Sequence, residues 1–139
     1  MIPKFRAWDK ETAEMCNVGA LYFSRDYELE VVSVHLPSGY VVNRSLTQVI
    51  LMQSTGLKDK NGVEIFEGDV VVGQQYLTTD SSTPFEIKGL VRYSKRNTMF
   101  YLDEKSFGHD KFMNSLGSSV YQFEVIGNSF ANPELLEVE

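Results

Sequence analysis

Apolar and polar residues alternate along much of this chain with the period of two that is typical of half-buried β-strands. The alternation is clear at Val32, Val34 and Leu36, and it returns over residues 85–93, which the apolar run 99–102 follows. Pro37-Ser38-Gly39 interrupts the first run, and the polar residues 94–97 interrupt the second. The pattern therefore predicts two β-hairpins.

Residues 52–71 place three glycines between two apolar stretches. Within them, Asn61-Gly62 is a strong short-range hairpin signal, and the glycines supply backbone conformations that other residues avoid. The apolar residues 46–52 include β-branched side chains, which favour a strand. This segment is predicted to direct the path of the chain rather than to supply reactive groups.

The remaining segments are less regular. Residues 77–84 combine Thr, Ser, Asp and Pro and predict a loop, and residues 103–117 predict an irregular connection. Residues 120–126 predict the last strand. Asn132-Pro133-Glu134 is a helix start signal, because Asn caps, Pro suits the first helical position and Glu favours the positive end of the helix. A short C-terminal helix is expected there.

The length of 139 residues fits one domain, and the 42% hydrophobic and 12% aromatic content exclude a disordered chain. The predicted fold is mainly β, with an N-terminal β-meander lobe over residues 1–50 and a second lobe over residues 51–139. No window is long and apolar enough for a membrane span, and the first residues lack the apolar core of a secretory signal.

Cys16 is the only cysteine, so an intrachain disulfide is impossible and a cysteine-based zinc site would need other ligands. A reducing cytoplasm is the expected location. The net charge of −6 argues against bulk nucleic-acid binding. The charge is unevenly spread, because residues 88–102 hold four bases and no acid while residues 112–139 hold four acids and no base.

The residue types that could perform catalysis are scattered along the sequence. They are His35, His109, Cys16, Glu64, Glu67 and Asp69. Residues 59–64 resemble a calcium loop but lack its ligand spacing, and no glycine run carries the Lys and Ser or Thr of a phosphate loop. The sequence therefore predicts no enzyme, no cofactor and no metal ion.

One basic and aromatic cluster stands out, formed by Arg92, Tyr93, Lys95, Arg96 and Tyr101. On a hairpin, such side chains contact single-stranded nucleic acid by stacking and phosphate pairing. The same aromatic residues are equally suited to a half-buried sheet.

Trp8 is the only tryptophan, and it lies in an aromatic N-terminal segment that is expected to form a strand. Packing on the core is the default interpretation of Trp8, and an anchor for a protein partner is the alternative.

Three stretches resemble the YopX-like family of bacteriophage and prophage proteins. They are residues 4–9, residues 51–71, and residues 123–136, which include Gly127-Asn128 and Asn132-Pro133-Glu134. The resemblance implies one YopX-like domain over residues 1–139, with an SH3-like barrel in the lobe of residues 51–139. It also implies a phage or prophage origin and the cytoplasm of the bacterial host, and it brings no known catalytic residues. Residues 15–49 and 74–117 carry no family pattern.

We expect a phage accessory protein that acts without catalysis, by binding a protein partner or by self-association as a homo-oligomer. One alternative is single-stranded nucleic-acid binding through the hairpin around Arg92 and Arg96. Another is an acidic mimic of DNA that uses Glu134, Glu137 and Glu139. No membrane partner is expected.

Overall fold

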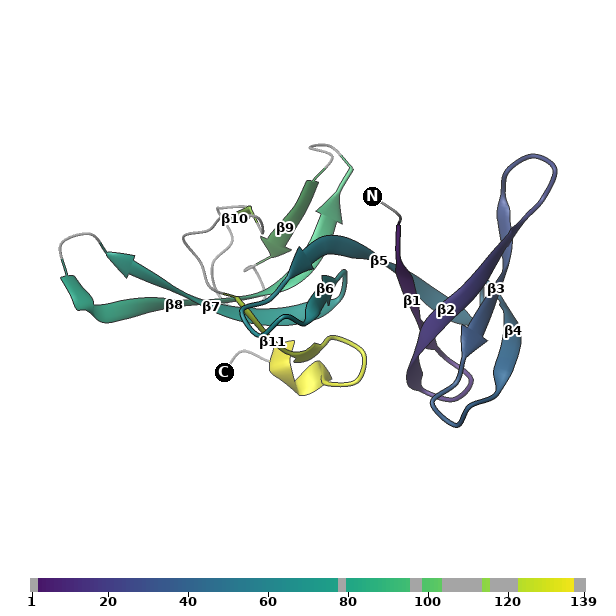
Figure 1. The fold of residues 1–139 in the computed structure, drawn as a ribbon, viewed down its shortest axis with the longest axis horizontal. Coiled ribbons are helices and arrows are strands. Elements are labelled where there is room, and N and C mark those ends of the chain that lie inside the picture. The colour runs from purple at the N-terminus through teal and green to yellow at the C-terminus, as the bar shows by residue number, and fades with distance from the viewer. Residues whose placement is uncertain (1–2, 78–79, 96–98, 104–113, 116–122, 137–139) are drawn as a thin grey trace. The chain divides into compact units, whose positions relative to one another are not determined.

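The computed structural model describes residues 3–77, 80–95, 99–103, 114–115 and 123–136. The chain divides into two compact units, Met1–Ser54 and Thr55–Glu139. Both units are built from antiparallel strands (Figure 1). The prediction of a mainly β fold is confirmed.

A six-stranded sheet has the strand order β4-β3-β2-β1-β5-β6. Its strands are β1 (Phe5–Asp9), β2 (Glu14–Phe23), β3 (Leu29–His35), β4 (Val41–Ser45), β5 (Val49–Lys58) and β6 (Glu64–Phe66). The strands β1 to β4 and the first half of β5 belong to the first unit, and β5 then continues into the second unit. In the N-terminal meander, β1 lies between β2 and β5 and pairs with both.

The core of the first unit lies on one face of this sheet. Ala7 pairs with Cys16 on one side and with Leu51 on the other, so the three side chains share a face. Alternate positions on β3 complete the cluster, because Val32 and Val34 are fully buried. The alternation that the sequence shows at these valines is therefore the core-facing side of β3.

The second unit holds a five-stranded sheet with the order β10-β9-β8-β7-β11. Its strands are β7 (Asp69–Leu77), β8 (Asp80–Ser94), β9 (Met99–Asp103), β10 (Asn114–Ser115) and β11 (Glu124–Asn128). A short 3-10 helix, η2 (Pro133–Leu136), follows β11. The helix start signal at Pro133 thus marks a single helical turn.

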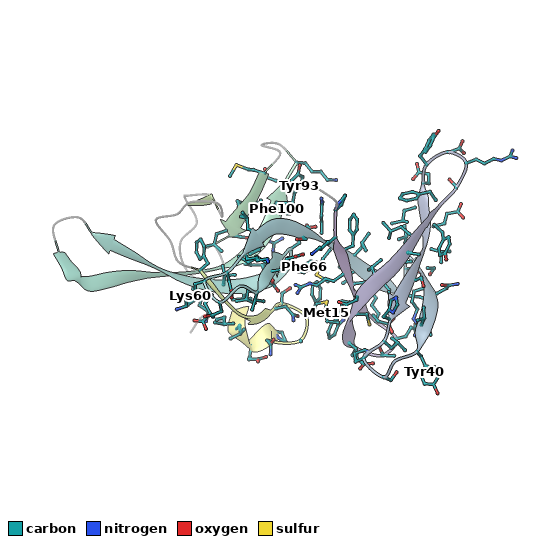
Figure 2. The ribbon with its side chains drawn as sticks, viewed as in Figure 1. Met15, Tyr40, Lys60, Phe66, Tyr93 and Phe100 are labelled. Atoms are coloured by element: carbon teal, nitrogen blue, oxygen red, sulfur yellow. The ribbon has the colours of Figure 1, made fainter. Side chains whose placement is uncertain are left out.

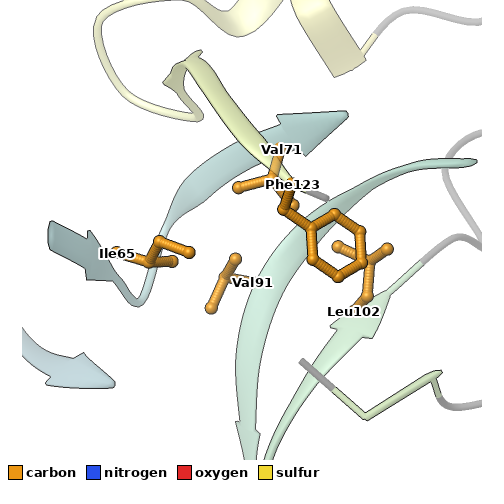
Figure 3. Close-up of a cluster of buried hydrophobic side chains, with 5 residues drawn as sticks. All are labelled: Ile65, Val71, Val91, Leu102 and Phe123. Atoms are coloured by element: carbon orange, nitrogen blue, oxygen red, sulfur yellow. The ribbon is translucent and has the colours of Figure 1, made fainter. Parts of the chain in front are cut away.

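The core of the second unit is formed by one apolar side chain from each of the strands β6, β7, β8 and β9 and by one from the residue before β11 (Figure 3). The cluster is formed by Ile65, Val71, Val91, Leu102 and Phe123. All are buried.

Two expectations about residues 51–139 need correction. The SH3-like barrel is not confirmed, because the described strands form two sheets that do not close: β5 and β6 extend the first sheet and do not pair with β10 or β11. The predicted loop at residues 77–84 is wrong, because β8 begins at Asp80 and pairs with Leu77 of β7. Pairing with a neighbouring strand overrides the weak strand preference of the Ser and Asp residues there.

The expected central hairpin is confirmed, since β5 and β6 flank the turn at Asn61-Gly62. Most of the irregular connection predicted at residues 103–117 lies outside the described residues. Among the residues that are described, no helix has the length and apolar character that crossing a bilayer requires.

Candidate functional site

The basic and aromatic cluster predicted from the sequence lies on β8 and β9, where it is divided between two faces. Arg92 pairs with Tyr101, and Tyr93 pairs with Phe100. Neighbouring residues of a strand point to opposite faces, so Arg92 and Tyr93 cannot act on one side of the sheet. Tyr93 and Phe100 instead contact each other edge to face, with ring centroids 5.0 Å apart (Figure 2).

The charge of Arg92 is balanced by a neighbour on the same hairpin. Its Nε lies 2.8 Å from Oδ2 of Asp103, while the Arg92 side chain keeps 52% of its surface exposed. Lys95 is exposed in the turn after β8, and Arg96 lies outside the described residues. The hairpin therefore presents a smaller positive charge than the sequence suggests.

Trp8 is half-buried on β1. Ala7 and Asp9 on either side of it are fully buried on the core face, so Trp8 lies on the opposite face of the sheet. Its direct cross-strand neighbours are Met15 and Ile50. Whether Trp8 also contacts a partner stays a prediction.

Among the potential catalytic residues, Cys16 lies in the core of the first unit. Cys16 is 2% exposed, and burial together with the charge of Asp9 raises the pKa of its thiol. His109 lies outside the described residues. Within the described residues, no three His, Cys, Asp or Glu side chains are arranged to hold a metal ion.

A buried ion pair lies in the first unit. Arg44 donates from Nε to Oδ1 of Asp9 at 3.0 Å and from a terminal nitrogen to Oδ2 at 3.2 Å. The Thr12 hydroxyl donates to the same carboxylate at 2.7 Å. Burial raises the pKa of Asp9, but these hydrogen bonds outweigh it and hold the pKa below its usual value. The pair links β1 to β4 through two hydrogen bonds.

The central glycine-rich segment is organised by Asp59. Its Oδ1 accepts hydrogen bonds from the backbone amides of Asn61 and Val63, both at 2.8 Å. Its Oδ2 accepts from the amide of Val125 at 3.0 Å, and the amide of Lys60 donates to the carbonyl of Phe123 at 2.9 Å. The turn between β5 and β6 therefore covers part of the outer edge of β11.

A second set of hydrogen bonds stabilises the turn that follows β11. Asn128 Oδ1 accepts from the amides of Phe130 and Ala131, and Asn132 Oδ1 accepts from the amide of Asn128. The amide of Ser129 reaches the carbonyl of Gly68 at 2.9 Å. Like Asp59, these polar side chains accept hydrogen bonds from backbone amides.

The turn between β2 and β3 has the same architecture as the Asp59 turn. The amide of Ser24 donates to the carbonyl of Glu28 at 2.8 Å, and the amide of Tyr27 donates to the carbonyl of Ser24 at 3.1 Å. The Ser24 hydroxyl accepts from the amides of Asp26 and Glu28, both at 3.2 Å. Together these bonds hold the backbone of Asp26, Tyr27 and Glu28 against Ser24.

Tyr27 has a positive φ of 64°. Two other turns share the same pair of backbone hydrogen bonds, and at the equivalent position they carry Gly39 with φ 103° and Gly62 with φ 83°. A side chain in this left-handed conformation costs roughly 1–2 kcal/mol, which glycine avoids. Tyrosine thus occupies a position where the other two turns use glycine.

Exposed aromatic side chains lie in this turn and at the end of β2 beside it. Tyr27 is 90% exposed, Phe23 58% and Tyr22 52%; we call these three residues the aromatic tip. Tyr22 and Phe23 are neighbours on β2 and point to opposite faces of the hairpin. β1 pairs only with residues 14–17 of β2, and β4 pairs only with residues 31–35 of β3. Among the described residues, Phe23 and Tyr27 therefore lie on a two-stranded extension, whereas Tyr22 pairs with Val31, which still pairs with Ser45 of β4.

The sequence reasoning missed the aromatic tip. The polar run Ser24-Arg25-Asp26 after two aromatic residues is a turn signal, but the turn holds no glycine to reveal the left-handed position. Tyr27 itself gives no sign in the sequence that its backbone is strained.

Comparison with known proteins decides the family. The family model described as YopX protein matches residues 4–137. The chain belongs to the YopX family. No curated protein matches the chain.

Two solved structures resemble this YopX family member over nearly its whole length. Protein EF1440 from Enterococcus faecalis is 30% identical with a TM-score of 0.60, and the match covers 99% of each chain. Protein yopX from Bacillus subtilis is 20% identical with a TM-score of 0.60, covering 96% of this chain and 95% of that one. The second likeness concerns the fold alone, and neither name specifies an activity.

The stretches that suggested the YopX family hold structural residues. Asp59 and Asn128 are both in these stretches, and both satisfy backbone amides. The aromatic tip lies in residues 15–49, outside the stretches. In this YopX protein the turn residues Asp59 and Asn128 therefore lie within the family stretches, and the aromatic tip lies outside them.

Proposed function

We propose that this YopX family protein acts by binding another protein, and that the aromatic tip is its contact surface. The observation that carries the proposal is Tyr27, which combines 90% exposure with a φ of 64°. Backbone strain of this kind persists only where the surrounding structure holds it, and it clusters at functional sites.

The chemistry of the aromatic tip fits a protein partner. Tyrosine and tryptophan are enriched among the residues that contribute most to interfaces, because they bury a large rigid surface with few rotatable bonds. The Ser24 hydrogen bonds fix the backbone of Tyr27 in advance, which lowers the entropy lost on binding. The proposed partner therefore offers an apolar pocket that receives Tyr27 or Phe23.

Nucleic-acid binding receives less support. Stacking and phosphate pairing need aromatic and basic groups on one face. Tyr93 lies on the face opposite Arg92. Tyr101 shares the face of Arg92, but the charge of Arg92 is already paired with Asp103. The acidic mimic relies on Glu134, which is exposed, and on Glu137 and Glu139, which lie outside the described residues. No geometry favours that reading over protein binding.

The family resemblance supports a proposal about the origin of the protein and its location in the cell. We propose a phage or prophage accessory protein that acts without catalysis in the cytoplasm of its bacterial host. A single buried cysteine is compatible with that reducing compartment.

The test places a photo-crosslinking amino acid at Tyr27 of the full chain in bacterial cells, with the same replacement at the exposed Val63 as the matched control. We expect an adduct at position 27 that is absent at position 63. The crosslinked protein is then identified, purified and titrated against the wild type and the Tyr27→Gly variant.

A hot-spot residue contributes about 2 kcal/mol, so Tyr27→Gly should weaken the purified complex by about 30-fold. Phe23→Ser should weaken it in the same direction. Equal adducts at both positions, or an unchanged affinity of the Tyr27→Gly variant, would overturn the proposal.

A further inference from the structure

A second surface, separate from the aromatic tip, is the outer edge of β4. This strand ends the six-stranded sheet. The amide of Leu36 donates to the carbonyl of Tyr40 at 2.8 Å. This bond shows which residue pairs of β3 and β4 are hydrogen-bonded to each other. Because hydrogen-bonded and non-bonded pairs alternate in an antiparallel ladder, Val42 and Arg44 bond to β3. Val41, Asn43 and Ser45 then direct their backbone groups outward.

One end of this edge is closed by a side chain. Gln48 Oε1 accepts from the amide of Ser45 at 2.9 Å, and the amide of Gln48 donates to the carbonyl of Ser45 at 3.0 Å. Across the described residues, no hydrogen bond reaches the outward backbone groups of Val41 and Asn43. The open part of the edge is therefore limited to the stretch from Val41 to Asn43.

The edge strand β11 of the other sheet is treated differently. Asp59, Lys60 and Asn132 all make hydrogen bonds to backbone groups on or beside it. Natural sheets usually block their edges with charges, prolines or covering segments, because an open edge pairs with another strand. β4 has no proline, no lysine and no covering segment among the described residues.

We propose that the edge of β4 binds β4 of a second copy of this chain in antiparallel orientation, with the two-fold axis at Val42. In this register Val41 of each copy lies opposite Asn43 of the other. Each such pair exchanges two backbone hydrogen bonds, so the pairing uses all the open groups and leaves the Gln48 cap intact.

The open edge of β4 fits a second copy of the same strand. A two-fold interface must be self-complementary, and the open groups of Val41 and Asn43 are symmetric about Val42. The two Val42 side chains meet at the axis, next to the core cluster that Val42 contacts. The single charge of the strand is Arg44, which is paired with Asp9, so two copies approach without unpaired like charges.

Exposed apolar surface adjoins the open edge as well. Tyr40 is 73% exposed and Val41 56% exposed, and Tyr40 points away from the ribbon in Figure 2. Pairing covers part of both side chains. The contact of two five-residue strands is small, so the dimer is expected to be weak and to depend on concentration.

Light scattering on the full chain over about a hundredfold concentration range tests the proposal. The mass should rise from 15.8 kDa towards twice that value. Asn43→Pro removes an outward amide without removing a bond of the β3–β4 ladder, and it should stay monomeric at every concentration. Asn43→Thr is the matched control and should dimerise as the wild type does. If Asn43→Pro does not fold, Val41→Lys serves the same purpose, because an edge lysine opposes strand pairing.

A cysteine scan fixes the register. Residues at a non-bonded antiparallel pair lie close enough for a disulfide, so Val42→Cys should form a crosslinked dimer with oxidised glutathione. Leu46→Cys should not. Tyr27→Gly should leave the mass unchanged, which separates this proposal from the function of the aromatic tip. A wild type that stays monomeric, dimers of Asn43→Pro, or crosslinking at position 46 alone would overturn the proposal.

Discussion

The carboxylate of Asp59 accepts a hydrogen bond from the backbone amide of Val125 at 3.0 Å, across 66 positions of the sequence. The other oxygen of the same carboxylate holds the turn that contains Gly62. Burial raises the pKa of Asp59, but the hydrogen bonds from Val125, Val63 and Asn61 outweigh it and lower the pKa below its usual value. One side chain thus joins the local turn to the strand β11.

Asp59→Asn should lower the free energy of unfolding by about 1–3 kcal/mol, because an amide nitrogen would face at least one backbone donor that loses its acceptor. Urea denaturation at neutral pH measures this change. Glu30→Gln, on an exposed carboxylate of β3, is the control and should leave the stability nearly unchanged.

The pH dependence of the same carboxylate has a definite sign. A folded-state pKa below the unfolded value of about 3.9 stabilises the folded protein above that pH, and this stabilisation is lost as the pH falls through the folded-state pKa. The difference between the wild type and Asp59→Asn should therefore shrink in acid below about pH 4. A constant difference down to pH 2 would contradict the role of the charge.

Tyr27→Gly should stabilise the protein by up to about 1 kcal/mol, because relief of the left-handed strain exceeds the extra entropy that glycine loses on folding. Thermal unfolding followed by circular dichroism measures the gain. The matched reverse change is Gly39→Ala, which meets nothing within 4 Å and should destabilise through strain alone, by about 1 kcal/mol. A loss of stability in Tyr27→Gly would show that the Tyr27 side chain contributes contacts that outweigh its strain.

The strands that could be predicted are those with a one-sided core or a glycine turn. Val32 and Val34 are buried on one face of β3. Because only one face of β3 is buried there, apolar residues recur at every second position of the sequence. Strand β8 escaped prediction at its start, because its Ser and Asp residues pair with β7 without any apolar pattern. The sheet order also could not be predicted, since the pairing of β1 with β5 joins segments that are far apart in sequence.

The same limit explains the outcome for the site. The cluster around Arg92 was found because its residue types are adjacent in sequence, yet adjacency on a strand places Arg92 and Tyr93 on opposite faces. Tyr27 was missed for the opposite reason, because its importance lies in a backbone angle and an exposure that only the fold sets. Asp59 was identified as part of a turn, but its bond to Val125 depends on where β11 lies.

Arg92→Ala should leave the affinity for a short single-stranded oligonucleotide unchanged within about twofold, at low and at high salt, because the pair with Asp103 already balances the charge of Arg92. Fluorescence anisotropy measures the affinity, and Lys95→Ala is the parallel variant. A steep salt dependence in the wild type that Arg92→Ala reduces would instead support the nucleic-acid alternative.

Arg44→Gln should make the folded protein more stable as the pH falls from 7 towards 5, a dependence that the wild type lacks. In the wild type, hydrogen bonds from Arg44 and Thr12 hold the pKa of Asp9 below its usual value despite burial. Without the guanidinium, a fully buried carboxylate loses its charge partner, so its pKa should rise above the unfolded value. A raised folded-state pKa means that protonation stabilises the folded protein, and the variant should gain stability as the pH falls from 7 towards 5.

The measurement is the melting temperature of both proteins across that range. At pH 7 the variant should melt on the order of 10 °C below the wild type, since breaking a buried pair leaves a charge without compensation. The gap should narrow towards pH 5, because the wild-type melting temperature changes little there while that of Arg44→Gln rises. The double variant Asp9→Asn with Arg44→Gln is the control, and it should lose the new pH dependence because no carboxylate is left at position 9 to titrate. Parallel curves for Arg44→Gln and the wild type would mean that water or another group takes over the role of Arg44.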